Sequence, residues 1–376
     1  MDNRERAIKA AHYRPVDKLP LTPGGPREST LARWRAEGLP EGADWYAHIL
    51  GEAGVPYERP VGYVPHHVDT RMVPTFEEEV LSHEGGHYIV RDWMGAVTEI
   101  SDEFDYTYIR GAKDFVTRKW HSFPVRDRAD WPAMRARYDP DEPSRYPADA
   151  GGLRERMEGR GYASRLSVNG PFWQMREWMG FEGLCIALMD DPAFVAEMAE
   201  FWRLFIAKVI RRAASLIPFD FLCISEDMAY KAHAMISPAM VREYCAPAYR
   251  EWGDIARGHG VSVVSVDSDG YVGELIPIWV ESGVDMNEPQ EVAAHNDVNE
   301  YRVRYGRDMA YGGGIDKRAI AAGGAVMEAE VRRVVEPFMR AGGGLLPGCD
   351  HGVPPDISLG NFVEYTRLLA KLTGWL

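Results

Sequence analysis

The sequence predicts an α/β protein, a (β/α)8 TIM barrel that forms one domain over residues 1–376 and carries an N-terminal insertion. Three observations predict it. After residue 160, short apolar runs typical of strands alternate with helical patterns at spacings of about 25–50 residues. Seven strands can be counted, more than a small open sheet needs, and an eighth is short or irregular. No Gly-x-Gly-x-x-Gly turn is present, which disfavours the alternative, a doubly wound sheet.

The N-terminal part fits the barrel pattern least well. Residues 3–12 read as a short helix, residues 18–25 as a buried strand that runs into a glycine turn, and residues 26–53 as helical. Residues 57–150 are rich in prolines and charges, and we expect them to form an irregular insertion or cap within the barrel domain. Inside this region, residues 87–100 have the pattern of a hairpin around Gly95.

From residue 163 onward, strands and helices alternate regularly. The predicted strands are 163–168, 219–224, 261–266, a short segment ending near 287–289, 308–311 and 343–348. The predicted helices are 191–216, 237–259, 273–282, 297–305, 324–341 and 359–372. Because the strands of such a barrel all end at one face, residues that follow different strands are expected to meet there.

Composition excludes several classes of function. A net charge of −14 without a Lys/Arg cluster argues against nucleic-acid binding. Four cysteines without a Cys-x-x-Cys pair indicate neither a disulfide framework nor a zinc knuckle. No apolar run approaches membrane-spanning length, and residues 1–6 contain no signal-peptide apolar region. We therefore expect a cytoplasmic protein with reduced thiols that binds a small molecule and could form a homodimer.

Polar residues follow the predicted strands, and they are the candidates for a functional site. They are Arg27, Asn169, Glu226, Asp227, Asp267, Asp269, Asp316, Cys349, Asp350 and His351. Among them, Arg27, Asn169, Asp316 and Asp350 are the candidates for substrate binding. Some are equally well explained as helix caps, and Asp316 is the clearest case.

Glu226, Asp227 and His351 are the candidates for catalysis. A carboxyl group can act as a general acid or base if burial raises its pKa, and an imidazole can act as an acid, a substrate orienter or a ligand. Ion pairs of the two carboxylates with Lys231 or Arg242 are an equally good explanation.

A thiol, a carboxylate and an imidazole crowd the end of the last predicted strand, in the stretch 343–356. An ordinary strand-to-helix loop, capped by Asp356 or Ser358, explains the end of this stretch but not the crowding of Cys349, Asp350 and His351. We therefore interpret the stretch as a functional loop.

Asp267, Asp269 and Cys349 are the candidates for a metal site. Two carboxylates two residues apart can converge on one ion, and a buried thiolate would complete an oxygen-rich set that could suit zinc. The alternative is that both aspartates are turn residues before Gly270.

Three segments resemble the uroporphyrinogen decarboxylase superfamily: residues 3–20, residues 312–318 (Gly-Gly-Gly-Ile-Asp-Lys-Arg) and residues 348–355 (Gly-Cys-Asp-His-Gly-Val-Pro-Pro). The first reads Asn-Arg-Glu-Arg-Ala-Ile-Lys-Ala-Ala, then Pro-Val-Asp-Lys-Leu-Pro. The resemblance covers nearly the whole chain and is most specific from about residue 160 on. It implies a (β/α)8 barrel, in agreement with the alternation of strands and helices.

The superfamily holds two chemistries. True decarboxylases have an arginine-rich segment after the first strand, where this chain keeps Arg27, and the acidic rim opposes a substrate with eight carboxylates. The corrinoid-linked methyltransferases bind zinc through His-x-Cys and a distant Cys. Asp267-x-Asp269 resembles the counterpart of the first motif, and Cys349 matches the distant ligand. The resemblance thus implies a harder, oxygen-rich metal site.

The function expected from the sequence is metal-assisted methyl transfer from a small methylated or methoxylated substrate to a separate corrinoid protein. One alternative is a decarboxylase of a carboxylated, tetrapyrrole-like substrate that uses the acidic rim and His351 without a metal. A second alternative is a non-catalytic barrel that serves as a binding or scaffold subunit.

Overall fold

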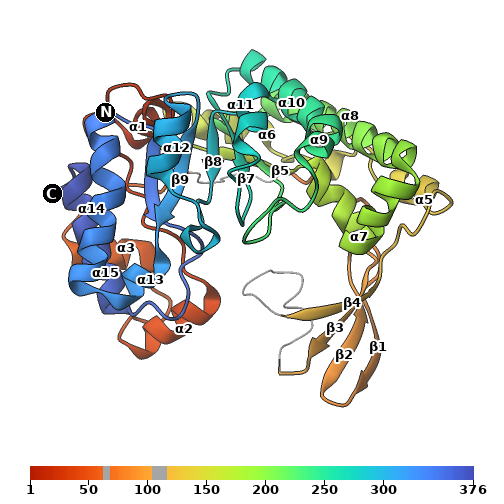
Figure 1. The fold of residues 1–376 in the computed structure, drawn as a ribbon, viewed down its shortest axis with the longest axis horizontal. Helices are drawn as coiled ribbons and strands as arrows, with labels where there is room; N and C mark the ends of the chain where they lie inside the picture. Colours follow the sequence, from red (N-terminus) through yellow and green to blue (C-terminus); the bar gives the residue numbers. More distant parts are fainter. Residues whose placement is uncertain (62–67, 104–116) are drawn as a thin grey trace.

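A parallel sheet of six strands, in the order β10-β9-β8-β7-β6-β5, forms the centre of the protein (Figure 1). The computed structural model describes residues 1–61, 68–103 and 117–376. The strands are β5 (Arg165–Asn169), β6 (Phe221–Ser225), β7 (Val263–Asp267), β8 (Met286–Glu288), β9 (Ala310–Ile315) and β10 (Leu345–Cys349). Every neighbouring pair is parallel, so all six carboxyl ends lie at one edge.

The predicted strands are confirmed at these places, but five of them begin two residues later than the pattern suggested, at 165, 221, 263, 310 and 345. The first three of these lie around one residue, Asp220. Asp220 explains much of this difference. Its carboxylate accepts the backbone N–H of Ser164 and pairs with Arg4 and Arg160, and its carbonyl accepts the N–H groups of residues 262 and 263. The residues before these strands are therefore held by both the carboxylate and the backbone of Asp220, outside the regular pairing of the strands.

The α/β class is confirmed, whereas the described residues show no closed ring of eight strands. The predicted first strand at 18–25 lies along β10 without forming a ladder. Thr22 Oγ1 donates to the Pro347 carbonyl at 2.8 Å, the Cys349 N–H donates to the Pro23 carbonyl at 3.1 Å, and Pro26 forms a single bridge with Val353. The prolines of this segment have no N–H to donate, which prevents regular pairing.

Helices cover the sheet and connect its strands. They are α7 (Pro171–Asp190), α8 (Pro192–Leu216), α9 (Pro238–Met240), α10 (Ala246–Gly258), α11 (Ile276–Glu281), α12 (Val298–Tyr305), α13 (Lys317–Ala322), α14 (Gly324–Ala341) and α15 (Leu359–Thr373). The predicted helix 237–259 is continuous, but a π-helical turn, η2 (Val241–Cys245), lies between α9 and α10. In the described residues no helix is both long and apolar enough to cross a bilayer.

The N-terminal part contains α1 (Asn3–Ala11), α2 (Glu28–Ala36) and α3 (Trp45–Ala53). The helix predicted at 3–12 is confirmed. The helical pattern over 26–53 is two helices, because Pro40 and Gly42 interrupt it. α1 packs against the amino end of β10, where the Gly344 N–H donates to the Ala10 carbonyl at 2.7 Å.

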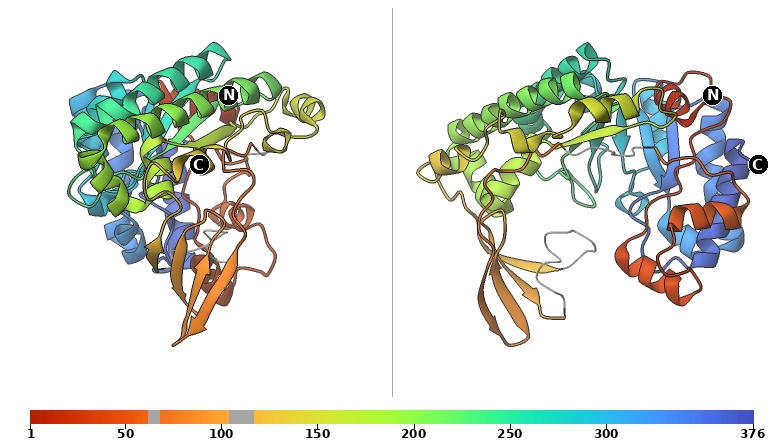
Figure 2. Two further views of the ribbon diagram at one scale, coloured as in Figure 1. Left: turned by 90° about the vertical axis from the view of Figure 1, so that its right-hand side faces the viewer. Right: turned by 180° about the vertical axis from the view of Figure 1, so that it is seen from behind.

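The predicted insertion, residues 57–150, contains an antiparallel sheet in the order β1-β2-β3-β4 that projects beside α7 (Figures 1 and 2). Its strands are β1 (Glu79–Glu84), β2 (His87–Arg91), β3 (Val97–Ser101) and β4 (Arg118–Ser122), and α5 (Trp131–Arg135), η1 (Pro143–Arg145) and α6 (Ala150–Met157) follow. The predicted hairpin is β2–β3. Its turn is held by Asp92, which accepts the N–H groups of Met94 and Ala96.

Candidate functional site

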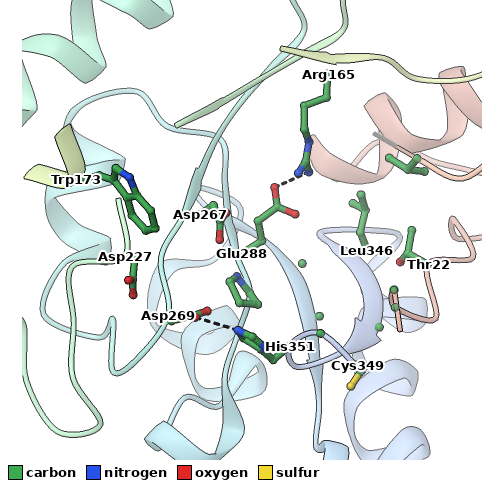
Figure 3. Close-up of a pocket in the computed structure, with 18 residues that line it drawn as sticks. Thr22, Arg165, Trp173, Asp227, Asp267, Asp269, Glu288, Leu346, Cys349 and His351 are labelled. Atoms are coloured by element: carbon green, nitrogen blue, oxygen red, sulfur yellow. Dashed lines mark hydrogen bonds and ion pairs between the residues drawn. The ribbon is translucent and has the colours of Figure 1, made fainter. Parts of the chain in front are cut away.

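A cavity of about 580 Å³ lies at the carboxyl ends of the parallel strands (Figure 3). Four carboxyl groups line it, together with one guanidinium, an imidazole and a thiol. These charged and reactive residues are Asp227, Asp267, Asp269, Glu288, Arg165, His351 and Cys349, and Thr22, Trp173 and Leu346 complete the labelled wall. The position of this acidic cavity agrees with the expectation that residues at the carboxyl ends of parallel strands meet at one face (the strand-exit rule).

Asp267 is the last residue of β7 and the acid with the most perturbed pKa on this wall. Burial raises its pKa to about 7, and the negative charges of Glu288 and Asp269 add to the rise, while Arg165 opposes it. Its carboxyl group accepts a hydrogen bond from the Ser225 hydroxyl at 3.5 Å. A substantial fraction of Asp267 is therefore protonated at neutral pH.

Asp269 and His351 form a pair across the cavity (Figure 3), with His351 Nε2 2.9 Å from Asp269 Oδ2. The hydrogen bond to Asp269 raises the pKa of His351, and burial opposes the rise. On the other side of the ring, Arg27 Nη2 lies 3.4 Å from Nδ1. The predicted residue Arg27 is thus placed behind His351, outside the cavity wall.

An ion pair between Arg165 and Glu288 lies deeper in the cavity, with 2.6 Å between Nη2 and Oε1. Ser265 donates its hydroxyl proton to the same Glu288 oxygen at 3.2 Å. Neither charged residue was among the candidates from the sequence. The sequence does contain features that could have identified them. Arg165 is the single charged residue in an otherwise uncharged strand, and Glu288 lies at the end of a strand, before Pro289.

The structure brings five of the ten predicted residues to the cavity: Asp227, Asp267, Asp269, Cys349 and His351. Asp227 has a positive φ of 41°, a conformation that is unusual outside glycine. Its carboxylate pairs with Arg176 at 3.0 Å, and not with Lys231 or Arg242 as considered above.

Glu226 does not line the cavity. Its side chain is fully buried, and it accepts hydrogen bonds from the Tyr249 hydroxyl and, at 3.0 Å, from the Trp173 N–H in the first turn of α7. Burial raises its pKa to about 7. Gly170 must be glycine here, because a Cβ would lie 2.1 Å from the Glu226 carboxyl carbon. This placement points to an anchoring role for Glu226 rather than contact with substrate.

The remaining predicted residues hold loops in place. Asp316 caps α13 through the N–H of Arg318 at 2.8 Å, as the capping alternative predicted. Asp350 is fully buried and accepts the N–H groups of Val292 and Lys317 at 2.9 and 3.1 Å, which joins three strand exits. Asn169 donates to Gln174 Oε1 at 3.2 Å, at the start of α7.

Comparison with known proteins supports the fold. No protein-family model matches the chain, and no curated protein sequence does. Among solved structures, a "methyltransferase from Methanosarcina mazei" matches 99% of this chain and 98% of its own length, with 11% sequence identity and a TM-score of 0.57. The two chains share a fold. At this identity the likeness concerns the fold alone.

The metal site implied by the resemblance can be tested against the geometry. Asp267, Asp269 and Cys349 do line one cavity. However, no three His, Cys, Asp or Glu side chains of the described residues are grouped so that one ion could bind them. Asp269 already bonds His351, and burial raises the pKa of the Cys349 thiol to about 12, so that it is protonated. This arrangement does not fit a zinc ion.

Proposed function

We propose that this chain is an enzyme that removes a methyl group from an oxygen or nitrogen atom of a small substrate and delivers it to a separate corrinoid protein. The fold shared with a protein named methyltransferase supports methyl transfer in general. The acidic cavity at the strand exits supports a site for a small polar substrate.

The observation that carries the proposal is the raised pKa of Asp267, about 7, in a cavity that a small molecule can enter. An alkoxide or amide anion is a poor leaving group, and loss of a methyl group from oxygen or nitrogen is therefore assisted by a proton donor. A carboxylic acid with a pKa near the working pH is an effective general acid. Asp267 has this property, whereas the pKa of an exposed aspartate is too low.

In the proposed step the bond between the methyl carbon and the substrate oxygen or nitrogen breaks, and its electron pair stays on that atom. Asp267 gives its proton to the same atom, so that a neutral alcohol or amine leaves. A nucleophile on the acceptor supplies the electron pair of the new bond to the methyl carbon. The bound corrinoid would supply that nucleophile. Arg165 favours the carboxylate that remains on Asp267, because its positive charge lowers the pKa of that group.

Two alternatives remain from the sequence, a decarboxylase and a non-catalytic scaffold. Four carboxyl groups on the cavity wall repel a polycarboxylate substrate, so nothing in the site favours decarboxylation of a tetrapyrrole over methyl transfer. A non-catalytic scaffold does not require a carboxyl group inside a cavity with a pKa of about 7, as Asp267 has.

The decisive experiment offers the purified chain a panel of methylated amines and methyl ethers with reduced free cobalamin as the methyl acceptor. Demethylated product is measured by NMR. Asp267→Asn keeps the shape but cannot give a proton, and it should lower the rate about a hundredfold or more. Asp254→Asn, on an exposed part of α10, is the matched control and should leave the rate unchanged. Turnover of uroporphyrinogen, or equal rates in the two variants, would reject the proposal.

The metal expected from the sequence is tested separately, by metal analysis of protein purified without chelator. From the geometry we expect less than one divalent ion per chain. One ion per chain that is lost in both Asp267→Ala and Cys349→Ala would show that these side chains regroup around a metal.

A further inference from the structure

A second cavity, of about 980 Å³, lies between α7, the antiparallel sheet and the loop after β6. Six aromatic side chains line it: Trp93, Trp120, Phe123, Trp173, Phe181 and Tyr230. Trp120 and Tyr230 are partly exposed, at 41% and 54%, so the cavity is open to solvent. Nothing in the proposed transfer step uses this cavity.

Flat rings form the wall because α7 is interrupted at Gly180. This residue has φ 73°, and a Cβ there would lie 2.3 Å from the ring of Phe123. Phe123 therefore packs directly on the helix backbone, and Trp120 stacks on Phe123 with 5.1 Å between ring centroids and 25° between planes. Together with Trp93, Phe181 and Tyr230, these rings form an aromatic wall against which another ring can pack.

Arg118 places a positive charge in this wall. Its guanidinium lies 4.9 Å from the centroid of the Trp120 ring, and no carboxylate of the described residues forms an ion pair with it. Burial lowers the pKa of Arg118, and the nearby charge of Asp92 opposes this only in part. Arg176, the other arginine of the cavity, is already paired with Asp227. A half-buried guanidinium that forms no ion pair with any described residue favours an anionic ligand.

The charges also argue against a cationic ligand. Arg118 and Arg176 lie over the rings of Trp120 and Trp173, at 4.9 and 4.8 Å from the ring centroids, and their positive charges repel a cationic ligand. Two acids line this cavity, Glu177 and Glu182, and Glu177 already accepts the indole N–H of Trp173 at 2.7 Å. Burial raises the pKa of Glu177 to about 7, so its negative charge is incomplete at neutral pH.

Trp173 connects the two cavities, because its side chain lines both. It stands next to Asp227 at the edge of the acidic cavity in Figure 3. A molecule that extends past Trp173 would have its reacting end among the carboxyl groups and its remainder on the aromatic wall.

We propose that the second cavity binds an aromatic carboxylate, which forms the non-reacting part of the substrate, with the ring on the aromatic wall and the carboxylate on Arg118. That this ligand is part of the substrate rests on the proposed methyl transfer. Binding of an aromatic carboxylate does not rest on it, because such a ligand needs no methyl group to bind.

The test measures binding of three probes to the full chain by calorimetry: benzoate, cyclohexanecarboxylate and benzyltrimethylammonium. Benzoate should bind, cyclohexanecarboxylate should bind at least fivefold more weakly, and benzyltrimethylammonium should not bind measurably. Equal binding of the two carboxylates would reject the role of the aromatic wall. Stronger binding of the cation than of benzoate would reject the anion site.

Variants then locate the site. Arg118→Gln should weaken benzoate binding at least tenfold, because it removes a charge-assisted contact in a shielded place. Arg91→Gln is the matched control on the same sheet, where the Arg91 side chain is 42% exposed and paired with Glu79, and it should have no effect. Trp120→Ala should weaken benzoate binding several-fold even if the arginine variant is unstable. If both Arg118→Gln and Trp120→Ala bind benzoate as the wild type does, the site is elsewhere and the proposal is wrong.

The two proposals fail in different ways. If benzoate binding depends on Arg118 but no methylated aromatic acid is turned over, the anion site of the second cavity is supported and the proposed methyl transfer is rejected. If methylated amines are demethylated but benzoate does not bind, the reverse holds.

Discussion

The two cavities share the side chain of Trp173 but differ in chemistry and origin. The acidic cavity is built at the exits of parallel strands, where the backbone of each strand fixes its last residues. The aromatic cavity is lined by residues of α7, of the antiparallel sheet of the insertion and of the loop after β6. The core thus positions the ionisable side chains at the strand ends, while the insertion supplies an aromatic surface that can select which small molecule reaches them.

The largest expected effect concerns the acidic cavity and the pH dependence of the proposed reaction. Asp267 must be protonated to act, and burial with its acidic neighbours raises its pKa to about 7. The value of kcat/KM should therefore be constant below about pH 7 and fall about tenfold per pH unit above it. The measurement is kcat/KM from pH 5 to 9. A rate that rises with pH over this range would mean that the essential group is a base and not Asp267.

Prediction from the sequence succeeded where the backbone alone decides the position of a side chain. Asp267, Asp269 and Cys349 follow strands directly, and the strand-exit rule brings them to one cavity. The same rule included Glu226, whose side chain turns toward the start of α7. The direction in which a residue turns depends on partners such as Tyr249 that are distant in sequence, and no pattern reveals them.

Ring closure and the second cavity were beyond prediction for a related reason. Each depends on how segments far apart in the chain meet. The prolines around residue 20 weaken pairing with β10, and the contact of Phe123 with Gly180 sets the aromatic wall. The charge of Arg165 in an apolar strand indicates that it has a partner, but the sequence does not indicate that this partner is Glu288.

The next effect concerns stability at the floor of the acidic cavity. Arg165→Met leaves Glu288 without its ion-pair partner, and we expect the free energy of unfolding to fall by about 2 kcal/mol. The loss is smaller than for a fully buried pair because both side chains are partly exposed, at 24% and 20%. Urea unfolding measures this change. Arg242→Met, which breaks the exposed pair with Glu281, is the control and should cost less than about 0.5 kcal/mol.

The same variant sharpens the comparison through the pH profile. Arg165 lowers the pKa of Asp267, so its removal should raise that pKa and move the falling limb of kcat/KM to higher pH. If the fall of kcat/KM stays at the same pH in a folded Arg165→Met protein, Arg165 does not influence the pKa of the acid that controls the rate.

A smaller effect is expected at the pair across the cavity. Asp269→Asn keeps the size of the side chain but removes the charge that raises the pKa of His351. The pKa of His351, followed by NMR of the ring protons, should therefore fall in this variant. Asp254→Asn should leave it unchanged. If the pKa of His351 stays where it was, the bond seen between Nε2 and Asp269 does not control the protonation of the ring.

The smallest effect is expected from Trp173→Phe. This variant tests whether Trp173 acts only through the packing surface of its ring or also through its indole N–H. Phenylalanine keeps a ring between the cavities but loses the indole N–H that Glu177 accepts at 2.7 Å. Loss of that bond should cost about 1 kcal/mol of stability and change benzoate affinity less than about threefold. Trp173→Ala removes the ring as well and should weaken benzoate binding further. If phenylalanine reduces the methyl-transfer rate as strongly as alanine does, the N–H of Trp173 acts on the reaction, and the two cavities must be treated as a single site.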